Sequence, residues 1–383
     1  MFKDKQIMAS AKLHPALADL ISFSAPPPAG KPNILGTPLA ELRTFVEENG
    51  LPGFRAQQIF HGIFRHRYKS FDDITNLSKD FRQILQQTFD ISRPKVEFVE
   101  KSADGTRKYK FVASDNLAYE AVFIPEVAKG RKSSTLCVSS QTGCAVGCKF
   151  CFTAALKRNR NLAASEIVGQ VLAVAEDLGH KEPDAKFTNI VFMGMGEPLL
   201  NYENVVRASE VLLDEEGLDF SARRVTISTS GIVPRIYDLG RDLPVQLAIS
   251  LNATTDEVRD QIMPINKKWP IEELVAAMRQ YPLRHRRRIT VEYVLLKDIN
   301  DSIEDAHRLT QLLQDIPVKI NILPLNPHDK TPYQPPTTET TDRFQAHLRK
   351  HGYHTMVRRT RGDEISAACG QLGETAMQNA ALL

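Results

Sequence analysis

The sequence is short of cysteine, of net charge and of long apolar runs. Its 383 residues include five cysteines, an odd number that gives no basis for a disulfide framework and suits a reducing compartment. The formal net charge is only +3, so polyanion binding depends on where the positive side chains cluster. No apolar stretch approaches the roughly 18 to 20 residues that cross a bilayer. These absences exclude an integral membrane protein and a disulfide-rich secreted domain, and we expect a cytoplasmic protein.

The chain is expected to start with a leader and a small helical domain. Residues 1–36 include a proline-rich stretch that lacks amide donors and favours extended backbone, which predicts a loosely ordered leader. Thr37 is the expected N-cap of the next helix, with Pro38 in its first turn. Residues 37–90 then carry apolar side chains at helical spacing together with a fringe of basic side chains. This pattern predicts a separate helical domain.

From residue 91 the pattern changes from helices to strands. Short runs bounded by Asp-Gly and Asp-Asn turn signals predict a β-strand extension over residues 91–130. Beyond it, apolar and β-branched segments alternate with amphipathic helices, which predicts parallel βα units and an α/β partial barrel over residues 131–345. Residues 346–383 remain as a C-terminal extension. The six expected barrel strands are residues 135–140, 187–194, 224–230, 245–251, 289–296 and 318–323.

Three cysteines stand directly after the first expected barrel strand. Cys144, Cys148 and Cys151 form a CxxxCxxC loop, and ligands of α/β folds lie at the carboxyl ends of the strands. A structural zinc site normally takes four protein ligands, and neither remaining cysteine has zinc-finger spacing. The loop instead suits a [4Fe-4S] cluster with one iron left open, and zinc remains the minor alternative.

A second group of residues follows the next expected strand. Residues 193–198 read Met-Gly-Met-Gly-Glu-Pro, in which glycine lets the backbone approach a ligand and the Glu197 carboxylate can accept hydrogen bonds from an ammonium group. Alone, this hexapeptide is more typical of a turn with a solvated glutamate. The CxxxCxxC loop after the first barrel strand resembles the radical S-adenosylmethionine (SAM) superfamily. One βα unit after that loop, the hexapeptide is similar to the motif that binds the SAM amino group in that superfamily.

That resemblance implies cofactors and the residues that bind them. Cys144, Cys148 and Cys151 would hold the [4Fe-4S] cluster, whose open iron chelates the amino and carboxylate groups of SAM. Gly196 and Glu197 would bind the SAM amino group. Further residues at strand ends match contacts to the ribose or methionine part of SAM, although each alone is typical of a strand-end cap. They are Ser228, Ser250, Leu251, Asn252 and Asn326.

Four motifs extend the resemblance to one family. The chain has Cys-Val-Ser-Ser-Gln at Cys137, Met-Gly-Met-Gly-Glu-Pro-Leu-Leu-Asn from Met193, Met-Pro-Ile-Asn-Lys-Lys from Met263, and Ala-Ala-Cys-Gly-Gln-Leu around Cys369. Together they are similar to the RlmN family, and the likeness covers residues 37–372. Members of that family methylate C2 of an adenosine at the peptidyl-transferase centre of 23S rRNA and of the adenosine beside the tRNA anticodon.

The family resemblance implies roles for the remaining cysteines and one carboxylate. C2 of adenine is electron-poor, so it does not attack the SAM methyl group as a nucleophile, and a radical route is required. Cys369 would take a methyl group from one SAM and become S-methylcysteine, while a second SAM is cleaved at the cluster. Glu120 would accept the C2 proton, and Cys137 would resolve the covalent RNA–protein intermediate through a transient disulfide with Cys369. An external reductant such as flavodoxin and a monomeric enzyme are expected.

Several positions depart from the family or concern RNA. Lys157-Arg158, beside the cysteine loop, stand where relatives have a glycine and an apolar residue, and Asn252 stands where relatives often have histidine. The arginine runs at 284–288 and 358–361 fit RNA phosphates or solvated loops. Alone, the basic fringe of residues 37–90 is typical of a solvated face, but these basic residues stand far in sequence from the barrel chemistry, so we expect an RNA-binding accessory domain.

Two rival functions remain open. One is Cfr-type methylation of C8 of the rRNA adenosine, which uses the same parts, although the Pro-Leu-Leu-Asn segment that starts at Pro198 is more similar to the C2 family. The other is a non-catalytic iron-sulfur or zinc RNA-binding module. Glu197, Cys137 and Cys369 argue against that module, because binding alone requires none of them.

Overall fold

The computed structural model describes residues 30–113, 115–128, 131–156, 160–179, 187–358 and 361–373. Most of the expected leader, Lys157-Arg158 and Arg359 therefore lie outside the described residues. No helix within the described ranges combines the length and apolar character that a membrane span requires.

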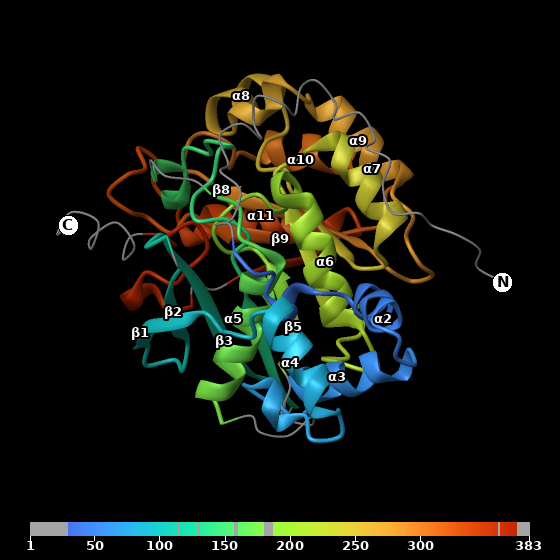
Figure 1. The fold of residues 1–383 in the computed structure, drawn as a ribbon. Coiled ribbons are helices and arrows are strands. Elements are labelled where there is room, and N and C mark those ends of the chain that lie inside the picture. The colour runs from blue at the N-terminus through green and yellow to red at the C-terminus, as the bar shows by residue number, and fades with distance from the viewer. Residues whose placement is uncertain are drawn as a thin grey trace.

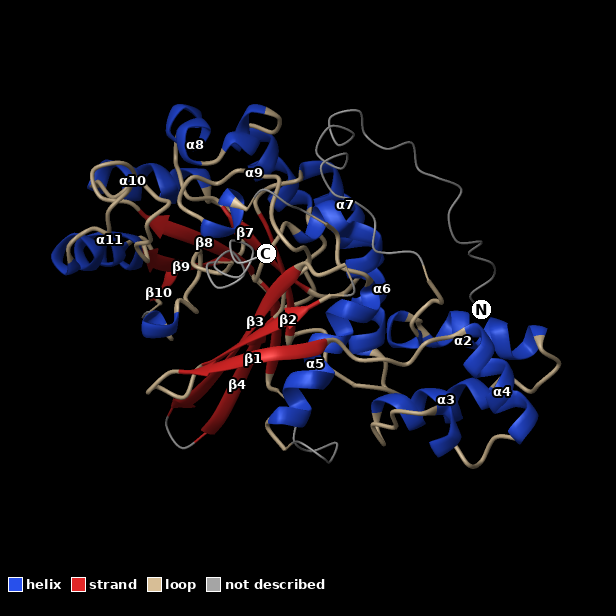
Figure 2. Cartoon of the chain, turned by 60° about the vertical axis from the view of Figure 1, so that its left-hand side comes forward, coloured by secondary structure: helices blue, strands red, loops and turns tan. Residues whose placement is uncertain are grey.

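Within the described ranges, ten strands form one mixed sheet and lie in it in sequence order. Figure 2 shows the strands of this sheet in red. The pairs from β1 to β4 are antiparallel, and every pair from β4 to β10 is parallel. The strands are β1 (Lys95–Lys101), β2 (Arg107–Val112), β3 (Ala118–Ala128), β4 (Arg131–Cys137), β5 (Asn189–Phe192), β6 (Val225–Thr229), β7 (Gln246–Ser250), β8 (Ile289–Leu295), β9 (Val318–Pro324) and β10 (His354–Val357). β4 to β9 correspond to the six expected barrel strands, so the prediction of an α/β partial barrel with a short β extension is confirmed.

Amphipathic helices cover the parallel strands from outside (Figure 1). In α5, for example, Ile167, Val171 and Val174 are buried, because apolar residues at helical spacing face the sheet. The helices are α2 (Leu39–Glu48), α3 (Phe54–Phe64), α4 (Lys79–Thr88), α5 (Ala164–Asp177), α6 (Tyr202–Leu213), α7 (Val233–Asp242), α8 (Asp256–Ile262), α9 (Ile271–Gln280), α10 (Ile303–Leu312) and α11 (Thr338–Lys350).

The expected helical domain begins one residue later than its sequence suggests. Pro38, rather than Thr37, is the N-cap of α2, and it makes no side-chain capping hydrogen bond. Thr37 instead closes the short 3₁₀ turn Ile34–Gly36, where its backbone N–H donates to the Ile34 carbonyl at 3.0 Å. Thr37 therefore ends the preceding 3₁₀ turn instead of capping α2.

The helical domain packs tightly on the barrel. A Cβ atom added to Gly36 would lie 2.5 Å from the backbone nitrogen of Ser165, so this glycine allows the 3₁₀ turn to contact the start of α5. Arg207 of α6 donates to both carboxylate oxygens of Glu41 in α2, at 2.5 and 2.8 Å. The ring of Phe60 in α3 lies against Gly217. The domain is therefore joined to the barrel by apolar and polar contacts.

β10 is a strand that the sequence did not predict. It follows α11 and pairs in parallel with β9, so it extends the sheet beyond the six expected barrel strands. His354 and Met356 are exposed and only Thr355 is buried. This four-residue segment lacks the apolar character that identified the other strands. The strand brings the segment that follows it back to the carboxyl ends of the barrel strands.

Candidate active site

A cavity of about 180 Å³ opens at the carboxyl ends of the parallel strands. Its walls come from the loop after β4, from the ends of β5 to β9 and from the segment around Cys369. Segments far apart in the sequence therefore meet where α/β proteins bind ligands. The expected site residues that line this cavity are Cys144, Cys148, Cys151, Gly196, Glu197, Ser228, Ser250, Asn252, Asn326 and Cys369.

The cysteine loop forms one wall of the cavity. Cys144, Cys148 and Cys151 are half-buried free thiols. The Cys151 N–H donates to the Cys148 carbonyl at 3.1 Å, and the Lys149 N–H donates to the Ile262 carbonyl at 3.0 Å, so the loop is folded back on itself and fixed to the end of α8. Three thiols from one loop beside an open space fit a [4Fe-4S] cluster with one iron facing a ligand.

Gly196 lets the segment after β5 cross the base of the cysteine loop. Its φ is +101°, and an added Cβ would lie 2.5 Å from the Cβ of Gln141 and 2.9 Å from its backbone nitrogen. Gln141 Oε1 accepts a hydrogen bond from the Glu197 N–H at 2.9 Å. The Met195 carbonyl accepts hydrogen bonds from the Ser140 and Gln141 amides at 2.9 and 3.1 Å. A side chain at position 196 would therefore push this segment and the cysteine loop apart.

The Glu197 carboxylate is buried and already oriented. Oε2 accepts hydrogen bonds from the backbone N–H and the hydroxyl of Ser230, both at 2.7 Å, and Oε1 accepts from the Leu199 N–H at 3.1 Å. Burial raises the pKa of Glu197, and the Ser230 hydrogen bonds oppose that shift. The carboxylate thus faces the cavity in a fixed direction, as a group that binds an ammonium must.

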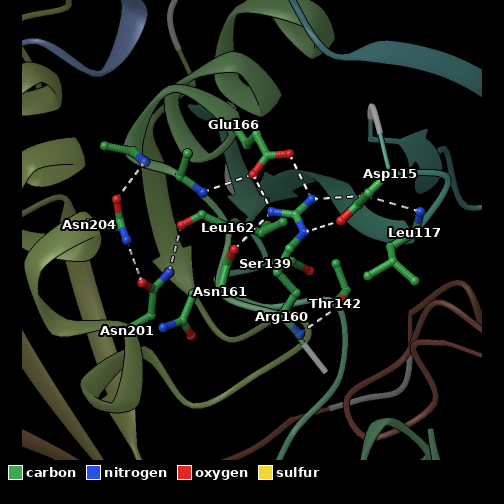
Figure 3. A network of polar contacts seen from close by, with 12 residues as sticks. Asp115, Leu117, Ser139, Thr142, Arg160, Asn161, Leu162, Glu166, Asn201 and Asn204 are labelled. Carbon is green, nitrogen blue, oxygen red and sulfur yellow. Dashed lines mark hydrogen bonds and ion pairs between the residues drawn. The ribbon is translucent and has the colours of Figure 1, made fainter. Parts of the chain in front are cut away.

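A polar network behind the cysteine loop is centred on Arg160 (Figure 3). The buried guanidinium donates to both oxygens of Glu166 at 2.8 and 2.9 Å and pairs with Asp115 at 2.6 Å. The Arg160 backbone exchanges hydrogen bonds of 3.0 and 2.9 Å with Thr142, two residues before Cys144. Burial lowers the pKa of Arg160, but the two carboxylates reverse that effect and raise it overall. This charged network fixes the start of the loop.

Asn201, which ends the Pro-Leu-Leu-Asn segment, supports the loop from the other side (Figure 3). Its side-chain amide donates to the carbonyls of Ser140 and Leu162, both at 2.8 Å. Its oxygen accepts from the Asn204 side chain at 2.8 Å. The asparagine of this motif is therefore a buried positioning residue rather than part of the cavity wall.

Arg259 is a functional candidate that the sequence analysis missed. This fully buried arginine donates to the carbonyls of Ser230 at 2.6 Å, Leu251 at 2.9 Å and Ser250 at 3.2 Å, and so joins the ends of β6 and β7. Burial lowers its pKa to about 10, and the nearby Cys148 opposes that shift. A cation here offsets negative charge on the thiolates. Its neighbours in α8 are mostly charged or polar, so the sequence suggested only a solvated helix.

Glu292 of β8 is a second missed candidate. It lines the cavity, is 9% exposed and accepts a hydrogen bond from the Asn321 side chain at 2.8 Å. Burial raises its pKa, while Arg358 and Lys319 oppose the shift. A carboxylate within an otherwise apolar strand was the available sequence signal, because such a group is costly to bury without a partner or a ligand.

The loop that carries Cys369 is bonded to the cysteine loop; we call residues 369–373 the carrier loop. The Gly370 carbonyl accepts from the Phe152 N–H at 2.7 Å, and the Leu372 carbonyl accepts from the Thr153 hydroxyl at 2.7 Å. Asn326 donates to the Cys369 carbonyl at 3.0 Å. Cys369, an exposed residue, therefore lines the same cavity as the three cysteines of the cysteine loop.

Cys137 and Glu120 lie behind the cavity rather than in its lining. Cys137 ends β4 and is 8% exposed; burial raises its pKa, and negative charge on the nearby Cys369 raises it further. Glu120 of β3 is fully buried, and its Oε2 accepts from the Gly373 N–H at 3.0 Å. Burial raises the pKa of Glu120, while Lys108 opposes the shift. Both groups are therefore next to the carrier loop.

The remaining expected binding residues differ in whether their side chains line the cavity. Ser228 and Ser250 line the cavity from β6 and β7. Asn252 has a φ of +59°, and its side chain accepts from the Val294 N–H at 2.8 Å and donates to the Met263 sulfur at 3.1 Å. Leu251 does not line the cavity, and its side chain is fully buried in the core. Contact between Leu251 and a ligand would have to use its backbone.

The basic segments lie at different ends of the barrel. Residues 284–288 precede β8 and so lie at the amino ends of the strands, on the opposite edge from the cavity. Arg358 follows β10 at the carboxyl ends, where its charge opposes the rise in the pKa of Cys369. In the helical domain, His61 contacts Glu216 at 2.5 Å and Lys69 contacts Glu176 at 3.0 Å, so part of the basic fringe pairs with the barrel.

Comparison with known proteins gives the family. Residues 138–310 match the radical SAM superfamily, and residues 32–91 match the ribosomal RNA large subunit methyltransferase N-terminal domain. The chain is 49% identical over 89% of its length to the dual-specificity RNA methyltransferase RlmN of Geotalea uraniireducens, covering 96% of that protein, and 47% identical over 89% of its length to that of Geobacter sulfurreducens, covering 91%. A crystal structure of a radical SAM methyltransferase from Sphaerobacter thermophilus superposes with a TM-score of 0.81 at 41% identity, over 89% of this chain and 99% of that one. The chain therefore belongs to the RlmN family of radical SAM RNA methyltransferases.

Proposed function

We propose that this protein methylates C2 of adenosine in 23S rRNA, at the peptidyl-transferase centre, and in tRNA, at the adenosine 3′ of the anticodon. The observation that carries the proposal is one cavity that holds three cysteines from a single loop together with Cys369, while Cys137 lies directly behind it. The relatives that share this chain's length are named as dual-specificity RNA methyltransferases, which supports both RNA classes.

The cavity residues fit the cofactors of a radical SAM enzyme. Cys144, Cys148 and Cys151 would hold the [4Fe-4S] cluster, and Gly196 and Glu197 would receive the SAM amino group at the adjoining wall. When bound, the cluster supplies the electron that cleaves SAM to the deoxyadenosyl radical. The ribose and methionine parts of SAM would contact a further set of residues. These are Ser228, Ser250, Leu251, Asn252 and Asn326.

Cys369 would carry the methyl group, and each turnover would use two SAM molecules. Its thiolate attacks the methyl carbon of the first SAM, S-adenosylhomocysteine leaves, and Cys369 becomes S-methylcysteine. That methyl group would give a hydrogen atom to the deoxyadenosyl radical derived from the second SAM, which becomes 5′-deoxyadenosine. The resulting carbon radical would bond to C2 of the adenosine, so the RNA is joined to Cys369. The exposed position of Cys369 at the cavity suits contact with a large substrate.

Release of the RNA would depend on Glu120 and Cys137. Glu120 would take the proton from C2 while the unpaired electron leaves the adduct for the oxidised cluster. The Cys137 thiolate would then attack the Cys369 sulfur, which breaks the bond to the RNA carbon and leaves a Cys137–Cys369 disulfide, and the released carbon takes up a proton to become the methyl group. Both groups adjoin the carrier loop, since Glu120 accepts from the Gly373 N–H and Cys137 is close enough to Cys369 for their charges to interact, and this supports their roles in release. A reductant such as flavodoxin returns the two thiols.

The division of labour between the two cysteines is the decisive test. Cys369→Ala should remove both S-methylcysteine and methylated RNA. Cys137→Ala should instead accumulate protein bonded to RNA through Cys369, seen by mass spectrometry after nuclease digestion. Normal release of methyladenosine by Cys137→Ala would reject the mechanism, and a new methyl group at C8 would indicate Cfr-type chemistry instead of C2 methylation.

The helical domain would position the RNA, and the protein would act as a cytoplasmic monomer. Deleting the domain is a poor test, because Phe60 packs against Gly217 and deletion would expose apolar barrel surface. Adding negative charge at exposed residues is cleaner: Arg43→Glu combined with His66→Glu should weaken RNA methylation several-fold and leave SAM cleavage without RNA unchanged. Equal RNA methylation by the variant and the unmodified enzyme would remove this role.

A further inference from the structure

Three histidines form a cluster on the outside of the barrel. His307 lies in α10, His347 lies in α11, and His351 is the C-cap of α11. One ring nitrogen from each histidine lies within 4.8 Å of the other two. None of the three lines the cavity that holds Cys369.

The helix geometry explains why these side chains meet. His347 and His351 are four residues apart and therefore project from the same side of α11. Their rings are stacked with centroids 4.3 Å apart, and His307 approaches them from α10 with centroid distances of 5.9 and 6.2 Å. Two ligands from one helix and a third from its neighbour form one face of a coordination site.

The hydrogen bonds leave ring nitrogens available to a metal. Nδ1 of His351 faces the His347 carbonyl at 2.8 Å, so it carries the hydrogen and leaves Nε2 as the acceptor in the neutral ring. Nε2 of His347 is buried and has no hydrogen-bond partner among the described residues. Buried polar atoms are nearly always satisfied, so an unpartnered imidazole nitrogen beside two other histidines indicates a missing ligand.

His307 can supply the third nitrogen. Its Nε2 lies 3.2 Å from the side-chain amide of Gln311, one turn along α10. If the amide presents its oxygen, Nε2 carries the hydrogen and Nδ1 is free to bind a metal. A carbonyl or amide that holds the second ring nitrogen is the usual outer partner of a metal-binding histidine.

We propose that His307, His347 and His351 bind a divalent transition-metal ion, for which zinc is the best match. Neutral imidazole suits zinc, and three histidines leave the fourth tetrahedral position to water. Zinc–nitrogen bonds of about 2.0 Å separate the nitrogens by roughly 3.3 Å, so the rings have to move together by up to about 1.5 Å. His307 and His351 are exposed and can make this adjustment by side-chain rotation.

A bound ion would link α10 to α11. α11 leads directly into β10, and β10 leads to Arg358 and the carrier loop. The ion would therefore stabilise the last βα unit of the barrel, at a distance from the reacting groups. This role is structural and is independent of the proposed methyl transfer.

Zinc binding to the cluster-loaded enzyme tests this site. Anaerobic enzyme with its iron-sulfur cluster in place is dialysed against zinc with a competing chelator, so that the three cluster cysteines are already occupied. We expect about one zinc per chain in addition to the iron. His347→Gln and His307→Gln should each lower the zinc affinity at least tenfold, and His354→Gln, which changes an exposed histidine in β10, should not.

Two further measurements locate the ion. Cys369→Ala should bind zinc as the unmodified enzyme does, which separates the site from the free thiols. Zinc should slow amide hydrogen exchange in α10 and α11 and leave α2 unchanged. Absence of extra zinc in the unmodified enzyme, or equal zinc affinity in His347→Gln, would overturn the proposal.

Discussion

The backbone N–H of Gly373 donates a 3.0 Å hydrogen bond to Oε2 of Glu120. This contact joins a fully buried carboxylate in β3 to the end of the carrier loop. The other carboxylate oxygen, Oε1, is buried without a hydrogen-bond partner among the described residues. Glu120 therefore positions the carrier loop through one carboxylate oxygen, and its other oxygen is left able to bind a proton.

Glu120→Gln separates these two roles. Glutamine keeps an oxygen that can accept from Gly373, so the carrier loop should stay in place and S-methylation of Cys369 should continue. It cannot accept the C2 proton, so RNA should remain bonded to Cys369 and release of product should fall by at least a hundredfold. Mass spectrometry of the protein after nuclease digestion measures the adduct. Loss of S-methylcysteine in this variant would instead assign Glu120 a purely structural role.

The stability of the enzyme should depend on pH through Glu120. Burial raises the pKa of this carboxyl group above its ordinary value of 4.5. The folded state therefore retains the proton while the unfolded chain loses it, and the neutral form favours folding. The stabilisation is complete below pH 4.5 and is lost as pH rises through the folded pKa. The melting temperature of the unmodified protein should therefore fall relative to that of Glu120→Gln as the pH goes from mildly acidic to neutral. A relative rise over this range would contradict the burial effect.

Glu292→Gln should weaken the binding of SAM. The Glu292 carboxylate lines the cavity and can accept hydrogen bonds from ligand hydroxyl or ammonium groups. Loss of a charge-assisted hydrogen bond corresponds to about 1.5–3 kcal/mol, so we expect the affinity to fall at least tenfold. Equilibrium binding of SAM to cluster-loaded enzyme measures this, and Glu257→Gln, at an exposed position in α8, is the matched control. Unchanged SAM affinity, with accumulation of RNA bonded to Cys369, would identify Glu292 as the proton acceptor in place of Glu120.

Gly196→Ala should disrupt the site, whereas Gly352→Ala should not. Both glycines have positive φ, of +101° and +84°, so alanine strains both by about 1–2 kcal/mol. Only at Gly196 would the added Cβ also collide with Gln141, at 2.5 Å, while Gly352 has no atom within 4 Å of that position. We expect Gly196→Ala to lose cluster content and SAM binding. Iron analysis and melting temperatures compare the two variants, and equal behaviour would show that backbone strain alone matters.

The main elements of the fold could be predicted because each repeats one physical pattern. β8, for instance, is an apolar strand followed by an amphipathic helix, and that alternation fixed the parallel barrel and the end at which ligands bind. β10 could not be predicted, since three of its four residues are at least partly exposed and it is stabilised only by pairing with β9. Its effect is large, because it returns Arg358 to the carboxyl ends of the strands.

Site residues could be predicted where their spacing in the sequence indicates their chemistry. They could not be predicted where their role depends on being buried beside the cavity. The three loop cysteines could be identified from the sequence because their spacing brings three thiols together. Arg259 and Glu292 have no such spacing, and their importance follows only from their burial beside the cavity. The placement of the basic runs was the least accessible to sequence reasoning, because a run such as residues 284–288 does not reveal which end of the barrel it occupies.

Arg358 should set the reactivity of the two thiols. Burial raises the pKa of Cys137 and of Cys369, and the positive charge of Arg358 opposes the rise at both. Arg358→Gln should therefore raise both pKa values and reduce the thiolate fraction at neutral pH. Because Arg358 is exposed and solvent screens its charge, we expect S-methylation of Cys369 to slow only several-fold. The lost rate should return as pH is raised, since the variant thiol then ionises.

Arg361→Gln, which removes an equal charge from an arginine that pairs with Asp104 at 3.6 Å, is the matched control. S-methylcysteine formed per minute, measured by mass spectrometry across a pH series, decides the question: a slow rate that does not recover at high pH would show that Arg358 positions the carrier loop instead of tuning its thiol.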